Sequence, residues 1–297
     1  MGRIGEVKMK RKKFMPYLFI MPFMISFLLF FAIPALYSLA LSFLNYKGYG
    51  QAKFVGGGNY EALLSYSAFW KAIKNTVFYF LAHLIPVMAG AFLIALAMQT
   101  KFMRRMQKIF KPIIFLPQIV PVMATALTFR IIFSKNTGAV NQFFGSSIAW
   151  LEDTAWMRWC VVVLVVWRSV GWFMVIFLAG LTTISSDINE AAIIDGASGF
   201  QVVKKITMPL MKPIFLFAFV MDAISSFKIY TEPNILIAGT GTLPTDAAPV
   251  MSIIANNIRS GNFGMASAAG WILFALILVI SLAEMALLKN KDEEGGR

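Results

Sequence analysis

The chain has 297 residues, of which 59% are hydrophobic and 14% charged, and its formal net charge is +13. This composition is far more apolar than that of a soluble globular domain and indicates a membrane protein with several spans. The cations lie between apolar runs rather than in a basic stripe with interleaved aromatic residues, which argues against a nucleic-acid partner. The single cysteine, Cys160, and the single histidine, His83, make a His/Cys metal site very improbable.

Apolar runs along the chain predict six membrane spans. The first run follows a basic N-terminal segment and is too long for the core of a signal peptide, so we expect it to remain as a span. We expect Pro86, Pro117 and Pro121 to bend the spans that contain them, and His83 to be a buried, hydrogen-bonded side chain rather than a proton relay. The expected spans are residues 17–44, 76–98, 112–133, 160–181, 213–229 and 265–288.

The positions of the lysines and arginines predict the orientation. Most of the 27 cations lie in the two terminal segments and in the second and fourth connections, so the positive-inside rule places both termini in the cytoplasm. The remaining connections, 45–75, 134–159 and 230–264, are then outside and too short for a separate domain. We expect one transmembrane domain over residues 1–297, with a basic cytoplasmic tail (1–16), a core (70–289), a cytoplasmic loop (182–212) and a second tail (290–297).

The cytoplasmic loop begins with signals for a short helix. Asp187 lies three residues before Glu190, which is a capping-box pattern for a helix start. Gly196 can take the left-handed conformation that ends a helix. We therefore expect a first helix between these residues.

A second short helix is expected directly afterwards. Ser198 and Gln201 form another capping-box pattern. Pro209 lacks an amide hydrogen and disfavours helical geometry at the preceding residue, so we expect this helix to end at Met208. The loop should thus form a compact, rigid hook rather than a flexible connection.

The hook also carries a family resemblance. Glu190-Ala191-Ala192 with Gly196, followed by the string ITMP at 206–209, resembles the EAA coupling signature of binding-protein-dependent ABC importer permeases. The string IDGAS at 194–198 is similar to the form found in the carbohydrate branch, the MalF-like permeases. Further similar stretches occur in order along the chain, at 54–56, 59–60, 69–70, 75–76, 115–121, 138–141, 167–171, 178–181 and 262–266.

This resemblance implies a fold and a set of partners. The fold would be all-α and integral to the membrane, with six transmembrane helices in the type I ABC importer (MetI-like) arrangement, in a bacterial or archaeal plasma membrane. The chain would pair with a second, MalG-like permease, two ATP-binding cassette subunits and an extracytoplasmic solute-binding protein. No GxxxxGK[ST] phosphate loop occurs, so the chain should hold no cofactor or catalytic residue, and ATP with Mg²⁺ would bind to the partner ATPases. The residues that would couple to those ATPases are Glu190, Ala191, Ala192, Asp195, Gly196 and Pro209.

Polar side chains inside the spans are candidates for a solute path. An unpaired charge in hydrocarbon costs about 3 kcal/mol or more, so Arg168 and Asp222 either contact solute or pair with each other or with the second permease. The resemblance implies a carbohydrate, most simply an oligosaccharide, and Trp172 offers a flat face for a sugar ring. In related sugar permeases the fourth and fifth spans line the central cavity, so the resemblance, together with the charges inside the spans, implies the path residues Arg168, Ser169, Trp172, Asp222, Ser225 and Lys228.

Alternatives to a neutral sugar remain open at this point. Two cations in one cavity, Arg168 and Lys228, would also suit a glycerol phosphate or an anionic uronate oligosaccharide, and a polyol is possible within the same family. A different class, an ion-coupled secondary transporter, would require carboxylates near the membrane midplane, where Asp222 is the only acidic candidate.

Overall fold

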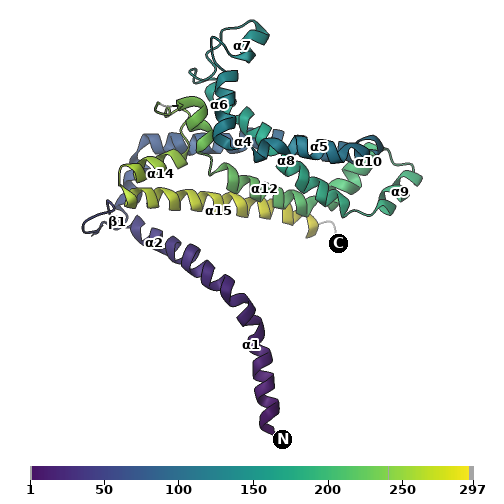
Figure 1. Ribbon diagram of the computed structural model, residues 1–297, viewed down its shortest axis with the longest axis horizontal. Helices are drawn as coiled ribbons and strands as arrows, with labels where there is room; N and C mark the ends of the chain where they lie inside the picture. Colours follow the sequence, from purple (N-terminus) through teal and green to yellow (C-terminus); the bar gives the residue numbers. More distant parts are fainter. Residues whose placement is uncertain (1, 240, 294–297) are drawn as a thin grey trace. The chain divides into compact units, whose positions relative to one another are not determined.

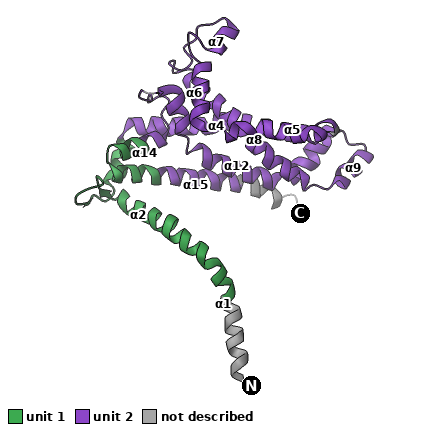
Figure 2. Ribbon diagram, viewed as in Figure 1, with its two compact units in different colours: residues 1–65, 254–271 green, residues 66–253, 272–297 purple. Residues whose placement is uncertain are grey.

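The computed structural model describes residues 2–239 and 241–293, and the side chains of residues 15–100, 102–239 and 241–286. The chain is predominantly helical, with one two-stranded antiparallel ribbon (Figure 1). It divides into two compact units, which Figure 2 shows in different colours. The first comprises residues 1–65 and 254–271, and the second comprises residues 66–253 and 272–297.

The first unit contains the first expected span. Helix α1 (Gly2–Phe27), a π-helical turn η1 (Leu28–Ala32) and α2 (Ile33–Ser42) follow one another without a break, so the expected tail 1–16 is helical from residue 2. The segment Met15–Ser42 is long and apolar enough to cross a membrane, and none of its most apolar window is buried. Its exposed apolar side chains require lipid or another protein around them.

Short elements follow this span in the same unit. Strand β1 (Leu44–Asn45) pairs with β2 (Lys53–Phe54), and α3 (Gly58–Ser65) comes next. Asn59 fixes the end of the span, because its amide group donates to the carbonyl oxygens of Ser42 at 2.8 Å and Leu44 at 2.9 Å. A Cβ on Gly264 would lie 1.9 Å from the carbonyl oxygen of Leu44, so only glycine fits at that position.

The second unit is built around α4 (Ser67–Met98) and α8 (Met157–Thr182), which pack side by side. Both are long and apolar enough to span a membrane, as expected, and Pro86 lies inside α4 without interrupting it. Buried alanines at 91 and 95 of α4 recur at the spacing of one helix face, and Phe177 of α8 belongs to the same core cluster. Gly171 allows α8 to approach α5 (Lys101–Ile119) closely, since a Cβ there would lie 2.1 Å from the carbonyl oxygen of Ile114.

The third expected span is not one straight helix. Phe102–Ile119 within α5 and α6 (Val122–Ile132) meet at 91°, so the run 112–133 is broken near its middle. The break is at Pro121, as expected, because the residue before a proline is pushed out of helical geometry and Val120 has ψ 134°. Pro117 lies inside α5. Helix α7 (Ala139–Phe144) follows in the connection after α6.

The hook is also bent where it joins the fifth expected span. Its elements are α9 (Ser186–Ile194), α10 (Gly199–Val202), a π-helical turn η2 (Val203–Thr207) and α11 (Met208–Leu210), and α12 (Lys212–Ser226) follows. The expected end at Met208 is wrong, because the wider turn before Pro209 accommodates the proline and the helix continues to Leu210. The 67° bend to α12 falls at Met211. The Met211 side chain packs against Gly180 of α8, where an added Cβ would lie 2.9 Å from the terminal methyl carbon of Met211.

The chain ends with α13 (Thr231–Pro233), a π-helical turn η3 (Asn234–Ala238), α14 (Val250–Arg259) and α15 (Phe263–Glu293). The part Phe263–Ala286 of α15 qualifies as a span. Together the described residues give four spans, or up to six if each bent pair counts as one, in agreement with the expected fold class. Residues 294–297 of the expected C-terminal tail lie outside the described residues.

Candidate functional site

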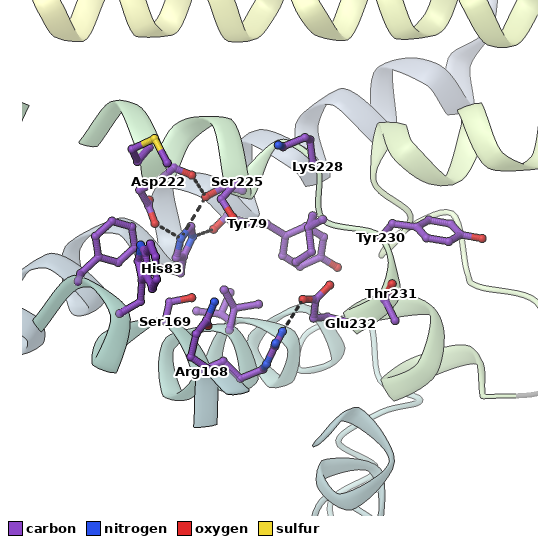
Figure 3. Close-up of a pocket in the computed structure, with 18 residues that line it drawn as sticks. Tyr79, His83, Arg168, Ser169, Asp222, Ser225, Lys228, Tyr230, Thr231 and Glu232 are labelled. Carbon is purple, nitrogen blue, oxygen red and sulfur yellow. Dashed lines mark hydrogen bonds and ion pairs between the residues drawn. The ribbon is translucent and has the colours of Figure 1, made fainter. Parts of the chain in front are cut away.

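A cavity of about 460 Å³ lies inside the second unit (Figure 3). Its walls come from α4, α5, α8 and α12 and from the segment 228–232. The structure brings all the expected path residues to this one cavity, namely Arg168, Ser169, Trp172, Asp222, Ser225 and Lys228. Eight polar or aromatic lining residues were not expected from the sequence, namely Tyr79, His83, Gln118, Phe173, Ser226, Tyr230, Thr231 and Glu232.

An ion pair joins two elements of the cavity wall. Nη1 of Arg168 on α8 lies 3.1 Å from Oε1 of Glu232 on α13, and the two side chains are 15% and 18% exposed. The expected alternative of an Arg168–Asp222 pair is therefore wrong. Glu232 was missed because it lies beyond the apolar run, in the segment that the sequence assigns to an outer connection. This pair neutralises one of the two cations that pointed to an anionic solute.

A second, fully buried pair joins α4 to α12. Nε2 of His83 lies 3.0 Å from Oδ1 of Asp222, and these side chains are 4% and 2% exposed. Nδ1 of His83 lies 2.7 Å from the carbonyl oxygen of Tyr79, so it must donate, because a carbonyl oxygen can only accept. His83 is thus buried and hydrogen-bonded, as expected.

Ser226 contacts both members of this pair. Its hydroxyl donates to the carbonyl oxygen of Asp222 at 2.6 Å, so toward Nε2 of His83, 3.1 Å away, it can only accept. A His83 ring with a proton on each nitrogen would donate to the Tyr79 carbonyl oxygen from Nδ1 and share its Nε2 hydrogen between Asp222 and Ser226. The second carboxylate oxygen of Asp222, Oδ2, is buried and has no hydrogen-bond partner among the described residues.

The charges in the cavity are therefore mostly paired. Arg168 is balanced by Glu232 and His83 by Asp222, whereas Lys228 makes no ion pair within the described part of the chain. Trp172 is half-exposed, and its ring lies 6.1 Å from that of Phe115. The cavity thus combines an aromatic face, hydroxyl groups, an acceptor oxygen and one unpaired cation.

The hook is fixed at both of its turns. Ser185, rather than the expected Asp187, is the N-cap of α9, because its hydroxyl oxygen accepts the Asp187 amide hydrogen. Gly196 has φ +84°, and the amide groups of Gly196 and Ala197 donate to the carbonyl oxygens of Ile193 and Ala192 at 3.0 and 2.9 Å. These two bonds form the Schellman motif that terminates α9.

The start of α10 agrees with the prediction. The Ser198 amide donates to Oε1 of Gln201 at 2.7 Å, and the Gln201 amide donates to the Ser198 hydroxyl at 3.3 Å. Of the six expected coupling residues, Ala192 is buried and the other five are exposed, namely Glu190, Ala191, Asp195, Gly196 and Pro209. Large apolar side chains are exposed beside them, with Ile194 84% and Phe200 74% accessible.

Comparisons with known proteins agree with this architecture. Residues 90–291 match the family described as binding-protein-dependent transport system inner membrane component. The lactose transport system permease protein of Rhizobium radiobacter is 30% identical over 285 residues, which cover 93% of this chain and 94% of that protein. The arabinooligosaccharides transport system permease protein of Bacillus subtilis (strain 168) is 30% identical over 292 residues, or 96% of this chain and 91% of that protein.

Solved structures show the same fold. A chain of a bacterial ABC transporter involved in the import of the acidic polysaccharide alginate superimposes with a TM-score of 0.80. The superposition covers 95% of this chain and 98% of that chain, at 22% sequence identity.

Proposed function

The chain belongs to the family of inner membrane components of binding-protein-dependent transport systems, and from this premise we propose that it forms half the pore of an ATP-driven oligosaccharide importer. The other half would be a second, MalG-like permease. Solute would arrive on an extracytoplasmic binding protein, and two partner ATPases would hold ATP and Mg²⁺. Both termini and the hook would face the cytoplasm, as the distribution of cations predicts.

The observation that carries the proposal is the polar cavity in the second unit. Its volume of about 460 Å³ falls within the range of small-molecule sites. Trp172 suits the apolar face of a sugar ring, and Ser169 and Ser225 suit its hydroxyl groups. Solute would pass these residues rather than remain bound.

The pairing of charges favours a neutral solute. With Arg168 bonded to Glu232, only Lys228 remains to attract an anion, so a uronate or a glycerol phosphate has less support than a neutral oligosaccharide. The names of the two relatives, which refer to lactose and arabinooligosaccharides, support the same choice. An ion-coupled mechanism is not favoured, since the family depends on binding proteins and Asp222 is already paired with His83.

The hook connects directly to the cavity walls. Helix α8, which carries Arg168 and Trp172, ends at Thr182, and α9 begins at Ser186. On the other side, α11 ends at Leu210 and α12, which carries Asp222, begins at Lys212. A movement of the hook by partner ATPases would therefore shift both walls, as in hinge and shear motions. The exposed apolar side chains of α9 and α10 are the type of surface that marks a protein contact.

Reconstitution tests this proposal. The chain should co-purify with a second permease and an ATPase, and proteoliposomes should take up labelled oligosaccharide only with ATP and a binding protein. Gly196→Asp should weaken ATPase docking without preventing membrane insertion, because a side chain is strained at φ +84°. Gly199→Asp is the matched control, since Gly199 has no positive φ and open space around it. Undiminished ATP-driven uptake by Gly196→Asp would contradict the coupling role.

A further inference from the structure

A second cavity, of about 540 Å³, lies at the opposite end of α8 from the hook. It is formed where α4 and α8 begin, together with the loop that precedes α14. The lining residues that matter for its chemistry are Lys71, Lys74, Asn75, Thr154, Arg158 and Asp246. We call it the basic pocket.

The basic pocket has more positive than negative charge. Nζ of Lys71 lies 3.3 Å from Oδ1 of Asp246, so these two charges balance. Neither Lys74 nor Arg158 has a carboxylate partner within the described residues. Two cations are thus left without an acidic partner in one concave site.

Arg158 is held in a fixed position. Its Nη1 donates to Oδ1 of Asn75 at 3.3 Å, and its guanidinium carbon lies 4.6 Å above the ring centre of Phe78. Its Nε is buried and makes no hydrogen bond to the described residues. A guanidinium group placed in this way keeps donors available for a carboxylate without having to rearrange.

The opposite wall is fixed as well. The Asn75 amide group donates to the carbonyl oxygens of Thr245 at 2.9 Å and Ala248 at 3.1 Å, on either side of Asp246. The Tyr79 hydroxyl donates to the carbonyl oxygen of Ala247 at 2.8 Å. The loop that carries Asp246 is therefore anchored to α4, and the pocket has a defined shape.

Positive charge at this place requires a compensating anion. Arg158 is the second residue of α8, where the helix dipole already presents partial positive charge and disfavours a cation. The outer side of a membrane protein is also the side that carries fewer lysines and arginines. Both effects are relieved when an anion occupies the pocket.

We propose that the basic pocket receives an acidic side chain of the extracytoplasmic binding protein when that protein docks on the importer. This inference rests on the proposed function, which puts the pocket on the outer face. The lining contains no large apolar side chain that could accommodate an acyl chain, which favours a carboxylate of a soluble protein over a lipid phosphate. The pocket would orient the binding protein and increase its association rate.

The test uses the complete importer in nanodiscs, with its own binding protein as the probe. Arg158→Glu should raise the binding-protein concentration for half-maximal ATPase stimulation by about tenfold or more at low salt, and weaken its salt dependence. Lys74→Glu should act in the same direction, and Lys74 is exposed and makes no ion pair with the described residues, so misfolding would not explain the loss. Lys135→Glu, an exposed cation outside the pocket, is the matched control and should leave the value unchanged.

The outcomes separate this inference from the proposed function. If the binding protein stimulates the unmodified importer but the two pocket variants behave like the control, the inference is wrong and the proposed function stands. If the unmodified importer shows no response to any binding protein, the proposed function itself fails. If the pocket variants differ only in nanodiscs that contain phosphatidylglycerol, and not in phosphatidylcholine alone, the anion is a lipid phosphate and the inference is overturned.

Discussion

Replacing Asp222 by leucine should destabilise the protein strongly, because the buried His83 ring loses its partner and must either remain charged and unpaired or give up its Nε2 proton. Both side chains are nearly inaccessible, at 4% and 2% exposed, so water cannot replace the lost partner. Breaking a buried pair from one side costs about 3–5 kcal/mol. For a chain of this size, roughly 2–4 °C of melting temperature corresponds to each kcal/mol, so a decrease on the order of 6–20 °C is expected.

The double variant tests the interaction between His83 and Asp222 more directly. When both His83 and Asp222 are replaced by leucine, no uncompensated charge remains, and the loss should be smaller than for either single change. Ser225→Ala, which alters a neighbouring cavity residue outside the pair, should have little effect. Cys160 is the only cysteine and is buried, so a thiol-reactive dye can report the melting of this chain. Additive losses in the double variant would refute the ion-pair interpretation.

Three further predictions concern packing, loop structure and solute. Gly171→Ala should cost about 1–3 kcal/mol by forcing α8 away from Ile114, whereas Gly90→Ala, where a Cβ would meet only ordinary contacts, should be tolerated in the same melting assay. Asn141→Ala should make the segment 134–150 sensitive to limited proteolysis, since that side chain bonds to both ends of the loop, including an indole nitrogen at 2.8 Å. Trp172→Ala should slow oligosaccharide uptake at limiting binding protein while leaving basal ATPase activity intact, and unchanged uptake would remove this residue from the solute path.

The sequence predicts local features of this protein better than distant ones. The end of α9 at Gly196 and the Ser198–Gln201 capping box were predicted correctly, because the interacting groups lie within a few residues of one another. The bend at Pro121 has the same local origin. The N-cap at Ser185 was missed because the capping-box pattern of Asp187 and Glu190 pointed two residues further on, and Ser185 is followed three residues later by Ile188 rather than by Glu or Gln.

Contacts between helices were beyond such reasoning. His83 and Asp222 are separated by 139 positions and Arg168 and Glu232 by 64, and hydropathy indicates only that each must find some partner. The six candidate path residues were named from the charges inside the spans and from the resemblance, and their convergence on one cavity became visible only in three dimensions. The basic pocket likewise joins segments whose charges give no sign of proximity in the sequence.

The shortness of the links between the hook and the cavity has a mechanical consequence. Three residues separate α8 from α9, and Met211 alone separates α11 from α12. Connectors of this length have almost no slack, so if partner ATPases move the hook as proposed, the movement would reach the cavity walls almost undiminished. Under the proposed function, lengthening either link with a flexible insert should therefore separate ATP hydrolysis by the partner ATPases from solute uptake by this chain.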